Sequence, residues 1–120
     1  MADASALTLV YATFTIPGVH CWPDAPDDVR HLRNPHRHLF HFKVTKQVTH
    51  DNRDTEFLIL GLNARAYIKT CFSSYDISNE TMDLQSTSCE TLARKLFENF
   101  GLHSCEVSED GENGAIITKL

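Results

Sequence analysis

The chain has 120 residues, which predicts a single domain over residues 1–120. With 42% hydrophobic and 22% charged residues, it has the composition of a globular protein. Sixteen acidic and eleven basic residues give a formal net charge of −5, which argues against binding nucleic acid through a broad basic surface. No apolar run approaches the roughly 20 residues of a membrane span. Met1–Ala6 has no basic or long apolar stretch, so export is not expected and the predicted location is the cytoplasm.

The first predicted elements are two strands joined by a loop. Residues 7–16 are rich in β-branched and aromatic residues and predict a strand that stops at Pro17-Gly18. Residues 21–35 contain three prolines and several aspartates and predict a loop. Between His38 and about His50, apolar and polar residues alternate strictly, which indicates a half-buried antiparallel strand.

Two helices are predicted next. Apolar residues recur every three or four positions between about Asp54 and Phe72, which predicts a helix. Residues 73–86 are polar and irregular. The pattern Thr87-x-x-Glu90 is a capping box, and it predicts a second helix that Gly101 closes.

The last predicted element is a hairpin. Residues 104–109 and 115–120 are short β-like runs, and the Asn113-Gly114 step between them is a hairpin signal. The order is therefore β-β-α-α-β-β. This order predicts an α+β fold in which an antiparallel sheet carries both helices on one face.

Histidine is unusually frequent in the first third of the chain. Five of the seven histidines lie between positions 20 and 41: His20, His31, His36, His38 and His41. His36 and His38 share the strand parity of Phe40, so they are expected at the mouth of the buried face. His20 follows the first strand and comes beside them if the first two strands pair. Three imidazoles that converge in this way can bind zinc and leave a fourth position open.

The remaining residues near this cluster have simpler interpretations as well. His41 points to the opposite face and reads as a solvated strand residue, and His31 lies in the loop and could hydrogen-bond the backbone. Cys21, beside His20, could be a fourth ligand, a nucleophile or a small buried apolar residue. The four cysteines lie far apart without a C-x-x-C motif, which favours free thiols over disulfides.

This sequence resembles the 6-pyruvoyl-tetrahydropterin synthase family. The family includes the bacterial 6-carboxy-tetrahydropterin synthases of the queuosine (deazapurine) pathway, and it has the T-fold. The resemblance starts with a strand ending in histidine, the loop 21–35 and the His-x-His that opens the next strand. It extends over nearly the whole chain through three further segments, which are Asn52–Phe57, Thr87–Ala93 and Cys105–Asp110.

The resemblance implies a ligand set and an assembly. It implies zinc on His20, His36 and His38, and it implies that Glu109 anchors a pterin- or guanine-like ring. A carboxylate suits that role because it accepts two parallel N–H bonds from a 2-amino-pyrimidinone edge. On the residues alone, Glu109 reads as an exposed carboxylate at the end of a hairpin. The family builds its sites between the subunits of a hexamer, so a homo-oligomer is implied.

The sequence departs from the family at the acid–base residues. The glycine between the family's two paired histidines is Arg37 here. The family's cysteine base should fall within Arg30–Arg33, where there is no cysteine. The family's Asp-His pair is also missing, because Asp76 is followed by Ile77.

Two functions from different classes are therefore open. The first is a zinc-dependent carbon–oxygen lyase acting on a pterin-like or GTP-derived triphosphate, with His31 or Cys21 as the base. Arg37, with Arg30 and Arg33, could hold the phosphate tail, or these arginines balance the aspartates of the loop. The second is a non-catalytic module that binds a purine- or pterin-like ligand for sequestration or regulation. A third interpretation is that zinc only joins two strands and the loop.

Overall fold

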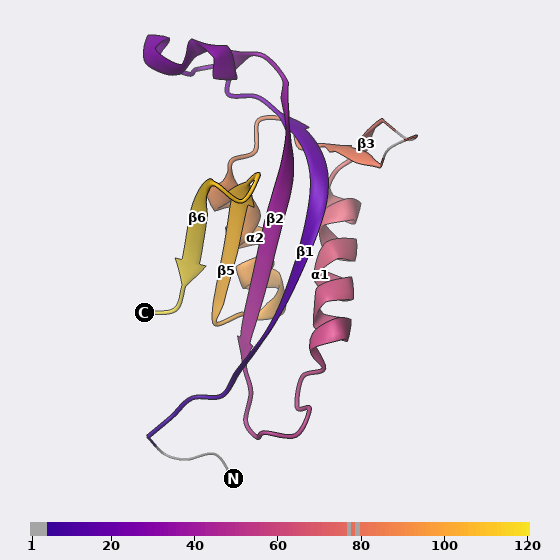
Figure 1. The fold of residues 1–120 in the computed structure, drawn as a ribbon, viewed down its shortest axis with the longest axis vertical. Coiled ribbons are helices and arrows are strands. Elements are labelled where there is room, and N and C mark those ends of the chain that lie inside the picture. Colours follow the sequence, from indigo (N-terminus) through magenta and orange to yellow (C-terminus); the bar gives the residue numbers. More distant parts are fainter. Residues whose placement is uncertain (1–4, 77, 79) are drawn as a thin grey trace.

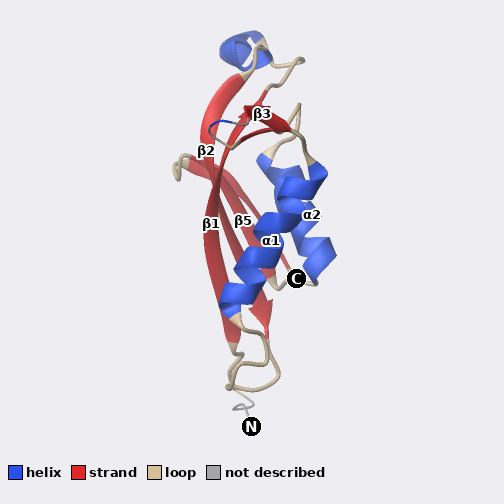
Figure 2. Cartoon of the chain, turned by 90° about the vertical axis from the view of Figure 1, so that its right-hand side faces the viewer, coloured by secondary structure: helices blue, strands red, loops and turns tan. Residues whose placement is uncertain are grey.

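The computed structural model describes residues 5–76, 78 and 80–120; Ile77 and part of Met1–Ala6 lie outside the described residues. The described chain forms one six-stranded sheet in the order β3-β4-β1-β2-β5-β6. Helices α1 (Phe57–Cys71) and α2 (Cys89–Phe100) both lie on the same side of this sheet, as Figures 1 and 2 show. The predicted α+β architecture with both helices on one face is confirmed.

The two longest strands form the centre of the sheet. Strands β1 (Leu9–His20) and β2 (His36–Gln47) are antiparallel partners over their whole length. Alternate residues of both strands are buried toward the helices, as the alternation in the sequence predicts. The loop between the strands contains a short 3-10 helix, η1 (Asp27–Arg33), which projects beyond the end of the sheet (Figure 1).

The predicted end of the first strand is wrong. Strand β1 continues through Pro17 and Gly18 as far as His20. Proline tolerates extended backbone where a strand is paired on one side only, and the parallel pairing with β4 (Thr81–Asp83) begins at Gly18. The longer strand brings His20 into the sheet, directly opposite His36.

The segment 73–86 also differs from its predicted irregular structure. It contains strands β3 (Ser74–Asp76) and β4, which pair with each other, and β4 also pairs with β1. Strands of three residues are too short to produce a recognisable alternation, so nothing in the sequence pattern marks them. Because β4 pairs with β1, the chain returns to the end of the sheet that carries the histidines.

Helix α1 begins at Phe57, slightly later than predicted. The residue before it, Glu56, caps the helix because its carboxylate accepts a hydrogen bond from the backbone N–H of Ile59. Asp54, the predicted start, instead accepts hydrogen bonds from Thr49, two residues after the end of β2.

The cap of helix α2 is displaced by one residue from the predicted capping box. The N-cap is Ser88, and its hydroxyl oxygen accepts a hydrogen bond from the N–H of Thr91. Thr87 lies outside the helix, and its carbonyl accepts a hydrogen bond from the ring of His20. At the other end Gly101 adopts φ 58° and ψ 48°, which confirms the predicted helix end.

The C-terminal hairpin forms with a different turn from the predicted one. Strands β5 (Ser104–Glu109) and β6 (Asn113–Thr118) pair so that Glu109 faces Asn113. The turn therefore consists of residues 110–112, with φ 57° at Asp110 and φ 72° at Gly111. Asp-Gly supplies the positive φ angles that a tight hairpin needs, so the Asn113-Gly114 step falls inside β6.

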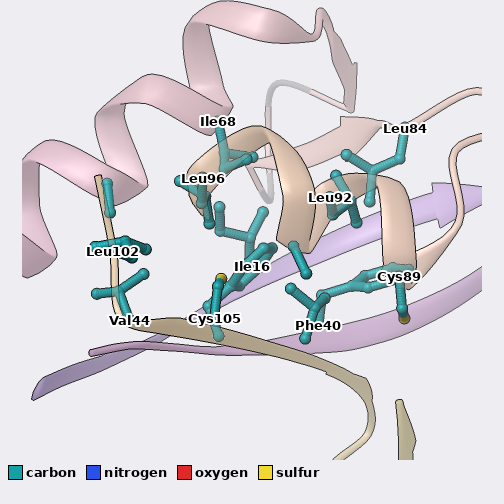
Figure 3. Packing of buried hydrophobic residues seen from close by; sticks show 14 of the residues in the cluster. Ile16, Phe40, Val44, Ile68, Leu84, Cys89, Leu92, Leu96, Leu102 and Cys105 are labelled. Atoms are coloured by element: carbon teal, nitrogen blue, oxygen red, sulfur yellow. The ribbon is translucent and has the colours of Figure 1, made fainter. Parts of the chain in front are cut away.

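The core lies between the sheet and the two helices (Figure 3). Its largest fully buried side chains are Ile16, Phe40, Phe42, Ile68, Leu84, Leu92, Leu96 and Leu102. At one end of this core, the Phe40 ring meets two histidine rings edge to face, with centroids 5.1 Å from His20 and 5.8 Å from His38. On the side that faces the core, the histidines therefore pack against close-packed apolar residues.

Candidate metal centre

Three histidines meet at the end of the sheet where β1 ends and β2 begins. His20 pairs with His36 across the two strands, and His38 lies two residues further along β2, on the same face. One nitrogen from each ring lies within 4.8 Å of the other two. The ring centroids are 4.6 to 5.5 Å apart. The convergence that strand pairing predicts is present.

Each ring is oriented by a hydrogen bond at Nδ1. The acceptors are the carbonyl of Thr87 for His20 at 2.9 Å and the carbonyl of Asn34 for His36 at 2.9 Å. For His38 the partner is a carboxylate oxygen of Asp110 at 2.7 Å. A carbonyl or an ionised carboxylate accepts only, so Nδ1 is the protonated nitrogen in every ring. The neutral rings therefore carry their lone pairs on Nε2.

The Nε2 atoms of His20 and His38 are buried and make no hydrogen bond of regular geometry to any residue that the structure describes. A buried polar atom without a partner is costly, and a metal ion between the rings would satisfy these lone pairs. Imidazoles held through Nδ1 by carbonyl or carboxylate oxygens form the usual arrangement of zinc-binding histidines. The donor set of His20, His36 and His38 therefore fits zinc.

Two acidic residues at the end of β5 contact this cluster. Glu109 pairs with Phe40 in the sheet, and its carboxylate lies 3.0 Å from Nε2 of His20 and 3.6 Å from Nε2 of His38. Its side chain is 31% exposed, so it is less open to solvent than a free hairpin end would be. Asp110 accepts hydrogen bonds from the backbone N–H of Leu39 and from His38, and these bonds lower the pKa of its carboxyl.

Sequence reasoning missed the role of Asp110. The Asp-Gly pair marks it as a turn residue, and the turn does form there. Its contact with His38 depends on how β5 and β2 pair, because Glu109 must lie opposite Phe40 for Asp110 to reach Leu39 and His38. A turn signal directly after a strand that pairs with the His-x-His strand is the feature that could have indicated it.

A pocket of about 550 Å³ adjoins the histidines. It is bordered by the end of β1, the start of α2 and the β5–β6 hairpin. The lining residues include His20, Cys21, Trp22, His36, Thr87, Ser88, Cys89, Glu90 and Glu109. The structure thus places Cys21 and Glu109 in one pocket with two of the three histidines.

Two other residues singled out in the sequence lie elsewhere. His31 is exposed on η1 and is not among the described residues that line the pocket. Arg37 is exposed and, by strand alternation, lies on the opposite face of β2 from the flanking histidines. Arg33 donates to the carbonyl of Ala25 and to the carboxylate of Asp27, so it is engaged within the loop.

The second cysteine of the pocket is a poor nucleophile. Burial raises the pKa of the Cys89 thiol to about 12, and the nearby carboxylates of Glu109 and Glu90 add to the effect. At neutral pH this thiol is therefore protonated. Of the two cysteines that line the pocket, Cys21 is the less buried.

A six-stranded sheet with two helices on one face, in which the three histidines converge at the end of the central strands, has the architecture of a T-fold. A scan of known protein families matched none of them, and no curated protein matched by sequence. Solved structures do match. The 6-pyruvoyl tetrahydropterin synthase of Caenorhabditis elegans aligns over 96% of this chain and 97% of its own, with a TM-score of 0.61 and 12% identity.

Two further solved structures are similar over most of the chain. An uncharacterized protein from Wolinella succinogenes covers 97% of this chain and 100% of its own, with a TM-score of 0.62 and 13% identity. The 6-pyruvoyl tetrahydropterin synthase of Plasmodium falciparum covers 93% and 97%, with a TM-score of 0.50 and 15% identity. These likenesses establish the fold that the sequence resemblance implied: this chain has the fold of the tetrahydropterin synthases.

Proposed function

We propose that this chain is a divergent zinc-dependent lyase of the tetrahydropterin synthase type, acting on a pterin-like or GTP-derived triphosphate. The observation that carries the proposal is the orientation of His20, His36 and His38. Each ring donates a hydrogen bond through Nδ1, which leaves the Nε2 lone pair for a metal ion, and the cluster adjoins a pocket. The substrates of the 6-carboxy-tetrahydropterin synthases in the queuosine (deazapurine) pathway belong to the same chemical class.

A zinc ion bound at these nitrogens would supply Lewis acidity toward the hydroxyl and carbonyl oxygens of a substrate side chain. The chain's own residues would bind the substrate and move its protons. Glu109 would anchor the ring by accepting two N–H bonds, for which its carboxylate must turn away from the histidines into the pocket. Cys21 is the candidate base inside the pocket, because it lines the pocket together with His20, the residue before it in the sequence.

His31 and Arg37 keep their proposed roles only in an assembly. Both are exposed outside the pocket of their own chain, so His31 as base or Arg37 as phosphate ligand would act on a substrate shared with a neighbouring subunit. The family resemblance supports such shared sites. The unpaired edges of β3 and β6 and the exposed apolar residues Phe57, Leu58 and Leu62 on α1 support association of copies.

We infer a homo-oligomer, with a hexamer as the expected size. Light scattering on the purified chain tests this: a molar mass six times that of one chain is expected, and a monomer would remove the shared-site roles of His31 and Arg37.

No helix among the described residues is long and apolar enough to cross a membrane. The cytoplasmic location and the absence of nucleic-acid and membrane partners stay predictions.

The test of the zinc site is elemental analysis of untagged protein and of two matched variants. About one zinc ion per chain is expected in the unaltered protein. His38→Ala should lose the metal, whereas His41→Ala, three residues along the same strand and on its opposite face, should keep it. Loss of zinc in both variants, or in neither, would contradict the three-histidine site.

The test of the lyase is turnover of dihydroneopterin triphosphate and related triphosphates. Product should form with the zinc-loaded protein and disappear in His36→Ala. Cys21→Ser should lower turnover while the zinc content stays the same, because this thiol lines the pocket and is assigned to proton transfer. Turnover unaffected by Cys21→Ser would exclude that assignment.

A second function is favoured by one specific observation. The segment Arg30–Arg33, where the family has its cysteine base, holds no cysteine, and the buried Cys89 of the pocket is protonated at neutral pH. A module that binds a purine- or pterin-like ligand without converting it needs neither group. Calorimetric binding of such a ligand with no product after long incubation would support this module and contradict the lyase.

A further inference from the structure

Glu109 occupies a position that the ring-anchoring role does not require. Its two carboxylate oxygens are directed at two different histidines, with Oε2 3.0 Å from Nε2 of His20 and Oε1 3.6 Å from Nε2 of His38. The carboxylate therefore lies against the metal-facing side of the cluster, although it also borders the pocket. This inference rests on the zinc site proposed above.

The geometry of these groups favours a positive charge between them. His20 and His38 carry their protons on Nδ1, because Thr87 and Asp110 accept hydrogen bonds there. Their Nε2 lone pairs then face the negatively charged oxygens of Glu109 at short range. Lone pairs and carboxylate oxygens repel one another unless a positive charge lies between them, and either a proton on Nε2 or a divalent metal ion held by all of these groups supplies that charge.

The distances agree with a shared coordination sphere. Zinc binds imidazole nitrogen and carboxylate oxygen at about 2.0–2.2 Å, so two ligands of one tetrahedral ion are about 3.3–3.6 Å apart. The separations of 3.0 Å and 3.6 Å between Glu109 and the two histidines span this range. The ligand atoms of the three histidines lie within 4.8 Å of one another, which exceeds this range, so the rings have to move toward one another when the ion binds.

We propose that Glu109 is the fourth protein ligand of the metal in the substrate-free protein. With four protein ligands the site is closed, and a substrate opens it by drawing Glu109 into the pocket. The strand itself need not move, because β5 is paired with β2 at Phe40 and with β6 at Asn113. Only the side chain of Glu109, which is 31% exposed, has to turn.

Cobalt(II) tests the proposal, because it replaces zinc and its visible absorption reports coordination number and ligand exchange. The variants are Glu109→Ala and Glu109→Gln, with Glu112→Gln as the matched control on an exposed carboxylate in the adjacent turn. Circular dichroism and thermal unfolding establish that each variant is folded. Azide serves as the probe of an open coordination position.

The unaltered protein and Glu112→Gln should bind cobalt with the same affinity, and azide should leave their spectra unchanged. Both Glu109 variants should bind cobalt more weakly by at least about tenfold, since even outer hydrogen-bond partners of metal ligands contribute that much. Their spectra should shift on addition of azide, which enters the vacated position. Activity plays no part in this readout.

The contrary results separate this inference from the zinc site itself. Equal cobalt affinity and equal azide response in the unaltered protein and both Glu109 variants would overturn the fourth-ligand role. If His38→Ala nevertheless lost its cobalt, the proposal of a three-histidine site would still be supported. No cobalt binding by the unaltered protein would overturn both proposals.

Discussion

The ring Nδ1 of His38 donates a hydrogen bond of 2.7 Å to the carboxylate of Asp110, although the two residues are 72 positions apart in the sequence. The other oxygen of the same carboxylate accepts the backbone N–H of Leu39 at 2.9 Å. Asp110 is thereby fixed to β2 by two bonds, and it in turn fixes the tautomer and the orientation of His38. The hairpin turn after β5 is thus a structural part of the candidate metal centre.

Asp110→Asn should weaken metal binding without removing it. The amide oxygen of asparagine can still accept the N–H of Leu39, but its NH₂ group cannot accept from Nδ1 of His38. The affinity for zinc, measured by competition with a chelator, should fall by about 10- to 100-fold. The same measurement on Glu112→Gln, in the same turn, should give the unaltered affinity. An unchanged affinity in Asp110→Asn would mean that the carboxylate does not support His38.

The strand pattern of the sequence was sufficient to place the histidines. Alternation from His38 onward fixes which face of β2 is buried, and the parity of Phe40 assigns His36 and His38 to that face. The position of His20 also followed from pairing of the first two strands. The error at Pro17 did not affect it, because a longer strand only aligned His20 more closely with His36.

The parts that failed depend on information outside any local pattern. Strands β3 and β4 exist because β4 pairs with the end of β1, and three residues carry too little alternation to reveal them. The contact of Glu109 with His20 joins the two ends of the chain through the pairing of β5 with β2. Pairing between distant strands fixes such contacts, and one sequence does not specify it by periodicity.

The cap of α2 gives a direct test of one corrected prediction. Ser88→Ala removes the hydroxyl that accepts from Thr91 and should lower the free energy of unfolding by about 0.5–2 kcal/mol. Thr87→Ala should have a smaller effect, because the Thr87 group used by His20 is its backbone carbonyl. Urea denaturation of both variants measures the difference. A larger loss for Thr87→Ala would restore the capping box that the sequence indicates.

The four free cysteines should differ sharply in reactivity. Burial raises the pKa of both Cys89 and Cys105 to about 12, so only about one thiol in 10⁴ is ionised at pH 8. Cys71 is exposed and Cys21 is half-buried, so these two should react with a thiol reagent first. Mass spectrometry after brief labelling identifies the modified residues, and denaturant should expose all four. Rapid labelling of Cys105 in the native protein would contradict its burial.

The same two raised pKa values make stability depend on alkaline pH. The pKa of each thiol is higher in the folded protein than in the unfolded chain, because the folded core favours the neutral thiol. The contribution of the neutral thiols to the free energy of unfolding is therefore fully present below the unfolded pKa. It is lost as the pH rises through the range between the unfolded and the folded values, because the unfolded thiols ionise first. The free energy of unfolding should therefore fall between about pH 9 and pH 12, and Cys105→Ala should reduce that slope.

Gly18, two residues before His20 on β1, is packed closely against Leu84 and Phe40. A Cβ atom at this position would lie 2.6 Å from Cδ1 of Leu84 and 3.1 Å from the Phe40 ring. Gly18→Ala should therefore cost about 1–3 kcal/mol in the free energy of unfolding, through overpacking of the core. Denaturant titration measures this loss, and Gly61→Ala, whose Cβ would meet only Ala12 at 3.0 Å, is a milder comparison.

The Leu84→Ala background determines whether the contact with Leu84 is the cause. Leu84 is fully buried, so its truncation alone should cost about 2–5 kcal/mol. In that background the added methyl group of Gly18→Ala gains space, and its cost should shrink by about 0.5–3 kcal/mol of coupling energy. Strictly additive losses in the double variant would show that the two side chains do not compete for the same space. The strain would then lie against Phe40, the ring that supports His20 and His38.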